Sequence, residues 1–245
     1  MRLSRLPFLR RLIPSWRKRV ALLQPRHRYR IVKRNGAHFV VNFANWADRM
    51  VVAHGLVERD QIDFFLDEIR RRHCSVFLDV GANMGLYSIF VAQQTECSKI
   101  IAFEPDQRSY AQLQANLLLN DLLEIVESRA VAVSDRDGRV PFEWGPATHN
   151  VWSKISQDAT AATRFVAAVR LDDAIPLSGQ KIAIKIDIEG HELKALQGME
   201  NLLRNNQCLM QVECFDNNLA PVRGAMELVG YKLVHQIGVD RYFAN

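Results

Sequence analysis

Short hydrophobic runs alternate with segments of helical periodicity over residues 73–245. The runs predict strands at residues 76–80, 99–104, 125–133, 181–187, 208–213, 231–236 and 241–243. The segments between them predict helices at residues 85–94, 107–120, 190–204 and 219–229. Strands that are joined by helical crossovers pair in parallel. We therefore expect an α/β fold of the Rossmann type, with a mostly parallel seven-stranded sheet and helices on both faces.

Residues 26–72 precede this repeat and predict a β-hairpin followed by a helix. Asn35-Gly36 separates two apolar-rich runs, and this dipeptide favours a type I′ turn between antiparallel strands. Residues 59–72 place apolar side chains from Ile62 to Ile69 on one face, which is typical of a helix. Residues 144–165 carry few strand signals and predict a long loop on the rim of the sheet, where His149 is a minor candidate for substrate contact.

Residues 1–25 form a basic amphipathic arm. Residues 1–34 carry twelve Arg or Lys and no acid, whereas residues 35–245 carry 20 basic and 27 acidic residues, a formal charge of −7. Apolar positions in the arm recur at steps of three and four, and Pro14 predicts a break in this helical pattern. Three interpretations stay open: residues 1–24 attach to an anionic membrane surface, cover the domain or a partner subunit, or act as a mitochondrial presequence.

The spacing of the cysteines and the lengths of the apolar runs indicate the cellular compartment and the number of domains. The four cysteines lie far apart without a CxxC pair, so neither a disulfide framework nor a zinc site is indicated. No apolar run reaches the length of a membrane span, and the arm lacks the apolar stretch of a secretory signal. We expect a cytoplasmic protein with one core domain at 73–245, and the arm leaves peripheral attachment to the inner face of the membrane open.

The strand at residues 76–80 leads into a glycine-bearing turn with the spacing Asp79-x-Gly81-x3-Gly85. Ligands bind outside the carboxyl ends of such strands, and glycine lets the backbone turn sharply and approach a ligand. A dinucleotide fingerprint would need GxGxxG, which this turn does not have. A carboxylate at Asp79 suits the ammonium and sulfonium groups of S-adenosylmethionine but would repel a pyrophosphate. The turn therefore predicts S-adenosylmethionine as the cofactor.

Glu104 ends the next predicted strand, 19 residues after Gly85. A carboxylate at this place can accept hydrogen bonds from both ribose hydroxyls. The order of strand, glycine turn, helix, strand and acid is the one that nucleoside binding requires. We expect the cofactor to contact Asp79, Gly81, Ala82, Asn83, Gly85, Tyr87, Glu104 and Pro105.

Three stretches of the chain resemble the signature motifs of FkbM-type methyltransferases. They are residues 77–85, residues 102–106 and the family-specific residues 185–198, and the resemblance spans about residues 55–235. It implies a class I methyltransferase that uses S-adenosylmethionine to methylate hydroxyl groups of sugars, glycolipids, polysaccharides or natural products. The resemblance does not choose among these acceptors, and it does not cover the basic arm.

Methyl transfer from a sulfonium requires an acceptor oxygen that is held close and relieved of its proton. Asp187 and Glu189 follow one predicted strand, and Glu213 ends the next. We expect Asp187 to be catalytic, with Glu189, His191 and Glu213 in support. These carboxylates could act as a base, orient hydroxyls or jointly hold a divalent metal, and the sequence leaves that choice open. His191 could instead only begin the helix that runs to residue 204.

Two functions of other classes remain as alternatives. A non-catalytic S-adenosylmethionine-binding protein would not need the acids that stand at three strand ends. The cationic arm favours a nucleic-acid-associated protein, but the negative formal charge of residues 35–245 does not. The motif Asn-Pro-Pro-Tyr of base methyltransferases is also absent. The expected partner is thus a hydroxyl-bearing small molecule or glycan rather than a nucleic acid, and an NAD-dependent oxidoreductase ranks last.

Overall fold

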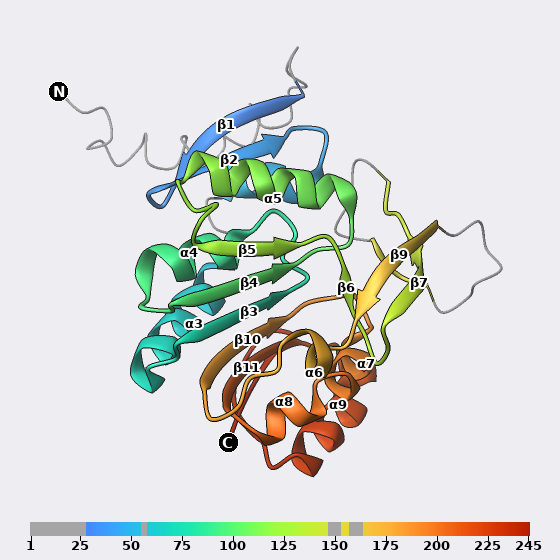
Figure 1. The fold of residues 1–245 in the computed structure, drawn as a ribbon. Coiled ribbons are helices and arrows are strands. Elements are labelled where there is room, and N and C mark those ends of the chain that lie inside the picture. The colour runs from blue at the N-terminus through green and yellow to red at the C-terminus, as the bar shows by residue number, and fades with distance from the viewer. Residues whose placement is uncertain (1–27, 55–57, 147–152, 157–163) are drawn as a thin grey trace.

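The computed structural model describes residues 28–54, 58–146, 153–156 and 164–245 (Figure 1). The basic arm at residues 1–25 and His149 lie outside these ranges. A seven-stranded sheet forms the centre of the molecule. Its strands are β3 (Val76–Val80), β4 (Lys99–Phe103), β5 (Val126–Arg129), β10 (Lys181–Ile186), β11 (Gln207–Glu213), β12 (Lys232–Ile237) and β13 (Asp240–Ala244).

The strand order β12-β13-β11-β10-β3-β4-β5 places the first strand of the sheet, β3, beside both β4 and β10. Every neighbouring pair from β11 to β5 is parallel, and β13 runs antiparallel to both of its neighbours. The chain moves outward from β3 to β5 and then returns to the other side of β3. Ligands bind at the carboxyl ends of strands where the order reverses in this way, which here is the edge between β3 and β10.

Helices cover both faces of this sheet, as the alternation of strands and helical segments predicts (Figure 1). Along β10, Ile182, Ile184 and Ile186 belong to one buried cluster and Ala183 to the other, because successive side chains point to opposite faces. The first cluster contains residues of α6 (Leu171–Ala174), α7 (Glu192–Gln197), α8 (Glu200–Arg204) and α9 (Asp216–Leu228). The second contains residues of α3 (Arg59–Arg72), α4 (Leu86–Gln94) and α5 (Gln107–Leu119). The α/β prediction is confirmed.

The predicted N-terminal hairpin is present as β1 (Tyr29–Arg34) and β2 (Ala37–Asn42). Asn35 and Gly36 have φ angles of 47° and 93°, as a type I′ turn requires. Asn116 of α5 and Asn120, which directly follows α5, accept hydrogen bonds from the backbone N–H groups of β2 at 2.6 and 2.9 Å. The hairpin therefore packs on α5 and shares its hydrophobic cluster. A helix that the sequence did not predict, α2 (Trp46–His54), follows it.

A second sheet of four strands lies beside the carboxyl edge of the first (Figure 1). It consists of β6 (Ala132–Val133), β7 (Gly138–Glu143), β8 (Lys154–Ile155) and β9 (Arg164–Val169). The sequence predicted one strand at residues 125–133, but the chain leaves the large sheet after Arg129 and pairs with β9 instead. The predicted loop at residues 144–165 contains β8 and the start of β9.

The helix predicted at residues 190–204 is divided into α7 and α8 at Gly198. A Cβ atom on Gly198 would lie 1.9 Å from the carbonyl oxygen of Ser134, just after β6. The chain therefore bends where it passes closely over the second sheet. Within the described residues, no helix has the length and apolar character needed to cross a bilayer.

Candidate active site

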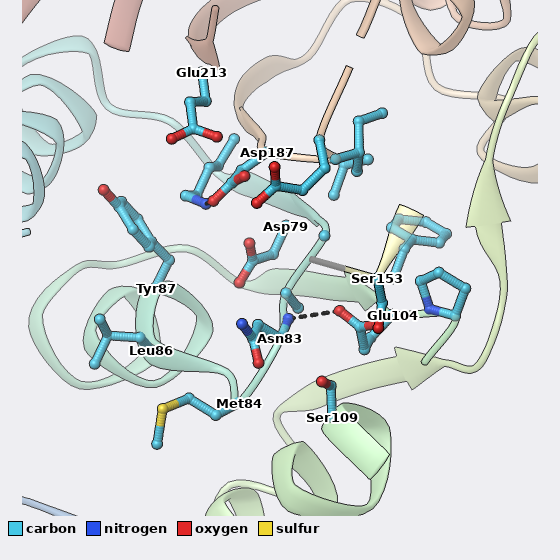
Figure 2. A pocket seen from close by; sticks show the side chains of 18 of the residues that line it. Asp79, Asn83, Met84, Leu86, Tyr87, Glu104, Ser109, Ser153, Asp187 and Glu213 are labelled. Carbon is cyan, nitrogen blue, oxygen red and sulfur yellow. Dashed lines mark hydrogen bonds and ion pairs between the residues drawn. The ribbon is translucent and has the colours of Figure 1, made fainter. Parts of the chain in front are cut away.

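A cavity of about 320 Å³ opens at the carboxyl ends of β3, β4 and β10, where the strand order reverses (Figure 2). Helix α2 and the second sheet contribute further walls. Seven acidic residues and two lysines line it. The acids are Asp48, Glu58, Asp79, Glu104, Asp187, Glu189 and Glu213, and the lysines are Lys154 and Lys185. An excess of carboxyl groups favours a positively charged ligand.

The glycine turn after β3 forms the floor of the cavity. Gly81 has a φ of 82°, which L-residues with a side chain rarely adopt. Its backbone N–H and that of Ala82 both donate to the carbonyl oxygen of Phe103, at 3.0 Å each. Gly85 begins α4 with a φ of 85° and faces Leu113 rather than the cavity. The sequence motif predicts close approach of a ligand to both glycines. In the structure Gly81 also lets β3 and β10 approach each other, and Gly85 serves the packing of α4.

Asp79 lies at the end of β3 with 1% of its surface exposed. Its Oδ2 accepts hydrogen bonds from the backbone N–H and the hydroxyl of Ser88, at 3.1 and 2.6 Å. Its Oδ1 is buried and has no hydrogen-bond partner among the described residues. A buried acceptor without a partner is costly, so a cationic donor entering the cavity would stabilise it. The ammonium and sulfonium end of S-adenosylmethionine is positively charged and would balance the negative charge of this carboxylate.

Glu104 lies at the end of β4 and faces the same turn (Figure 2). Its two carboxylate oxygens accept backbone hydrogen bonds from Asn83 at 2.8 Å and from Asp106 at 2.7 Å. Burial raises the pKa of Glu104 to about 8, and these two hydrogen bonds oppose that rise. The side chain is fixed in one orientation, and its oxygens retain lone pairs that can accept ribose hydroxyls.

Three carboxylates gather where β10 and β11 end. Oxygen atoms of Asp187, Glu189 and Glu213 all lie within 4.8 Å of one another. Lys185 adds an ammonium group, whose Nζ lies 2.9 Å from Oδ2 of Asp187. Glu189 has a φ of 55°, a strained conformation for a residue other than glycine, and such strain is often found at functional sites. Burial and the charge of Asp187 raise the pKa of Glu189 to about 7.

His191 is placed differently from the other predicted catalytic residues. It is not among the residues that line the cavity. Its Nε2 lies 2.9 Å from the hydroxyl of Ser134, and burial lowers the pKa of His191 to about 4. The imidazole therefore joins the start of α7 to the end of β6 and is neutral at pH 7. Asp187, Glu189 and Glu213 do line the cavity, as do all the predicted cofactor contacts except Gly85.

Sequence reasoning missed several residues of the cavity wall. Lys185 had a visible signal, because it interrupts the apolar run of a predicted central strand. Glu58 lies between two predicted elements, and no signal in the sequence marks it as part of the cavity wall. The aromatic and apolar contacts from α2, including Trp46, were hidden because that helix was not predicted.

Comparison with known proteins identifies the fold and the family. Residues 79–233 match the methyltransferase FkbM domain. The chain is 29% identical to methyltransferase sdnD of Sordaria araneosa, with 65% of this chain and 78% of that protein covered. It is 26% identical to hexuronic acid methyltransferase AglP of Haloferax volcanii, with 60% and 59% covered. It is 27% identical to 2-O-methyltransferase NoeI of Sinorhizobium fredii, with 66% and 74% covered.

Among solved structures, the crystal structure of methyltransferase FkbM from Methylobacillus flagellatus superposes with a TM-score of 0.53 at 16% identity. The match covers 70% of this chain but only 44% of that one, so this chain spans less than half of its length. The superposition shows a common fold. The match to the FkbM domain, which extends over more than half of the chain, shows that this chain belongs to the FkbM family of S-adenosylmethionine-dependent methyltransferases.

Proposed function

We propose that this enzyme transfers the methyl group of S-adenosylmethionine to a hydroxyl of a sugar, glycolipid, polysaccharide or related metabolite. The observation that carries the proposal is the carboxylate of Asp187, which lines the cavity and is held by Lys185 at 2.9 Å. An ionised carboxylate at this position suits the removal of a hydroxyl proton. Two relatives support a sugar acceptor, because one is a hexuronic acid methyltransferase and the other a 2-O-methyltransferase.

We assign cofactor binding to the turn after β3 and to the end of β4. In this proposal the free Oδ1 of Asp79 receives the positively charged end of the cofactor, and Glu104 accepts the ribose hydroxyls. Gly81, Ala82, Asn83, Tyr87 and Pro105 complete the cofactor wall. When bound, S-adenosylmethionine supplies a methyl group on a cationic sulfur that an oxygen nucleophile attacks in line.

We assign the acceptor hydroxyl to the space beside Asp187, Glu189 and Glu213. Asp187 takes the hydroxyl proton, and the other two carboxyl groups orient the acceptor through hydrogen bonds. The three groups are close enough to hold a cation, but Lys185 already neutralises one of them. The proposal therefore uses no metal. His191 keeps a structural role, because its contact with Ser134 lies away from the cavity lining.

The proposed domain division follows the sequence: an arm at residues 1–25, a hairpin with a helix at residues 26–72, and the catalytic domain at residues 73–245. The middle segment shares a hydrophobic cluster with the catalytic domain, so we expect the two to unfold together. Sedimentation of the full chain with anionic phosphatidylglycerol vesicles would test the membrane interpretation of the arm. Removal of residues 1–24 should abolish that sedimentation if the interpretation holds.

The acceptor class can be tested with methyl-labelled S-adenosylmethionine and a panel of neutral sugars, uronic acids and glycolipids. A methyl ether on a hydroxyl resists mild alkali, whereas a methyl ester on a carboxylate is hydrolysed and releases methanol. We expect alkali-stable label on a glycan acceptor, and labelling slower on the order of a hundredfold with Asp187→Asn. Alkali-labile label would show that a carboxylate is the acceptor and would contradict the proposal, as would label that appears only in nucleic acid.

A further inference from the structure

Lys185 is a buried lysine on a central strand of the sheet. It is 4% exposed, and its neighbours in register are Asp79 on β3 and Gln211 on β11. Its side chain points to the face opposite Ile184 and Ile186, toward α4. The ammonium lies 2.9 Å from Oδ2 of Asp187 and 4.7 Å from the centre of the Tyr87 ring. It is thus fixed by the carboxylate of Asp187, which directly follows its strand, and by the ring face of Tyr87.

Titratable groups from every neighbouring element surround this ammonium. The acidic groups that interact with it are Glu58, Asp79, Asp187, Glu189, Glu213 and Asp240, and the phenols are Tyr87 and Tyr242. The other cavity lysine, Lys154, lies on the exposed strand β8. Burial alone would lower the pKa of Lys185, but the charges of Asp187, Glu58 and Asp79 outweigh it and raise that pKa. Lys185 therefore stays protonated and cannot serve as the base.

The contact between Lys185 and Asp187 makes the pKa of Asp187 differ from that of Glu213. Burial would raise the pKa of Asp187, but the Lys185 charge and hydrogen bonds from Glu213 and Lys185 hold it below its ordinary value. Burial and the Asp187 charge raise the pKa of Glu213. Lys185 contacts Asp187 directly, and no hydrogen bond or ion pair between Lys185 and Glu213 is found among the described residues. Two neighbouring carboxyls of this kind share one proton, and the nearby cation decides which of them carries it.

We propose that Lys185 is a positioning residue for methyl transfer, whose ammonium keeps Asp187 as the carboxylate that receives the acceptor proton and leaves Glu213 protonated. This inference rests on the proposed role of Asp187. In the step, the acceptor O–H bond breaks and its proton moves to Asp187. The oxygen electron pair forms the new bond to the methyl carbon. The old carbon–sulfur bond breaks, and its electron pair remains on sulfur, which becomes a neutral thioether.

The pH dependence of kcat/KM in Lys185→Met and Lys185→Arg tests this role. Without the ammonium the pKa of Asp187 rises, so the acidic limb of the Lys185→Met profile should move up by about one pH unit or more. At a pH on the wild-type acidic limb its activity should fall at least about tenfold, and it should recover at higher pH. Lys185→Arg keeps the charge and should keep the wild-type profile. Lys181→Met, at the exposed start of the same strand, is the matched control and should change nothing.

A uniform loss of activity in Lys185→Met at every pH, with an unchanged profile, would overturn the positioning role. Binding of S-adenosylhomocysteine and thermal unfolding of each variant report whether it folds. If Lys185→Met does not fold, infrared spectra of proteins that retain Lys185 still decide the question. Glu213→Gln should remove an infrared band of a protonated carboxyl group from the wild-type spectrum at neutral pH, whereas Lys181→Met should leave that band in place. A Glu213→Gln spectrum that has lost no such band would refute the inference. Full turnover in Asp187→Asn would refute the proposed base separately.

Discussion

A Cβ atom on Gly81 would lie 1.9 Å from the carbonyl oxygen of Asp187. The backbone N–H of Asp187 also donates to the carbonyl oxygen of Val80 at 3.0 Å. The turn that we assign to the cofactor is therefore in direct backbone contact with Asp187, the residue that we assign to proton removal. Placing both on adjacent central strands fixes their separation, which is what an in-line transfer between two bound molecules requires.

Gly81→Ala should damage folding, cofactor binding and turnover together. The new methyl group meets backbone atoms that cannot move aside, and the φ of 82° strains any L side chain. We expect a loss of stability on the order of 3 kcal/mol. Gly224→Ala is the control, because its Cβ would enter open space within α9. It should leave the protein equally or slightly more stable in chemical denaturation. Equal stability of the two variants would disprove the close contact.

Glu104→Ala should weaken binding of S-adenosylhomocysteine by about tenfold to a hundredfold. The change removes a charge-assisted acceptor for the ribose and leaves the N–H groups of Asn83 and Asp106 without their partner. Titration calorimetry measures the effect. Glu127→Ala, on the neighbouring strand but partly exposed and away from the cavity lining, should bind as the wild type does.

Binding of S-adenosylhomocysteine should also weaken as the pH falls below 8. Burial raises the pKa of Glu104 to about 8, so the carboxyl group of the free enzyme gains a proton as the pH drops through that value. The ribose hydroxyls then lose their charged acceptor, and the dissociation constant should rise toward tenfold per pH unit. Glu104→Gln should flatten this dependence between pH 6 and about 8. If the pH dependence of S-adenosylhomocysteine binding persists in Glu104→Gln, it must come from another titrating group.

His191→Gln should retain turnover within a few-fold of the wild type. Glutamine can still hydrogen-bond the hydroxyl of Ser134, and the imidazole of His191 does not line the cavity. Steady-state kinetics at saturating cofactor measure the outcome. A loss of a hundredfold with unchanged thermal stability would restore His191 to the catalytic set.

The sequence predicted the central sheet well because its strands are apolar-rich runs between turn signals, as in 76–80 and 181–187. It predicted the ends of β3, β4, β10 and β11 as the site because parallel strands bring their carboxyl ends together. The second sheet was missed because its strands are short or carry exposed polar residues, such as Arg139 in β7. The break at Gly198 was missed because it depends on contact with the carbonyl of Ser134, far away in the sequence.

Single-turnover transfer with Asp187→Asn, with cofactor binding measured on the same sample, tests whether Asp187 receives the proton of the acceptor hydroxyl. Asparagine keeps the size of the side chain but cannot take the proton. We expect that S-adenosylhomocysteine binds within a few-fold of the wild-type affinity, while the transfer rate falls on the order of a hundredfold or more. An unchanged transfer rate in a variant that binds the cofactor normally would contradict it.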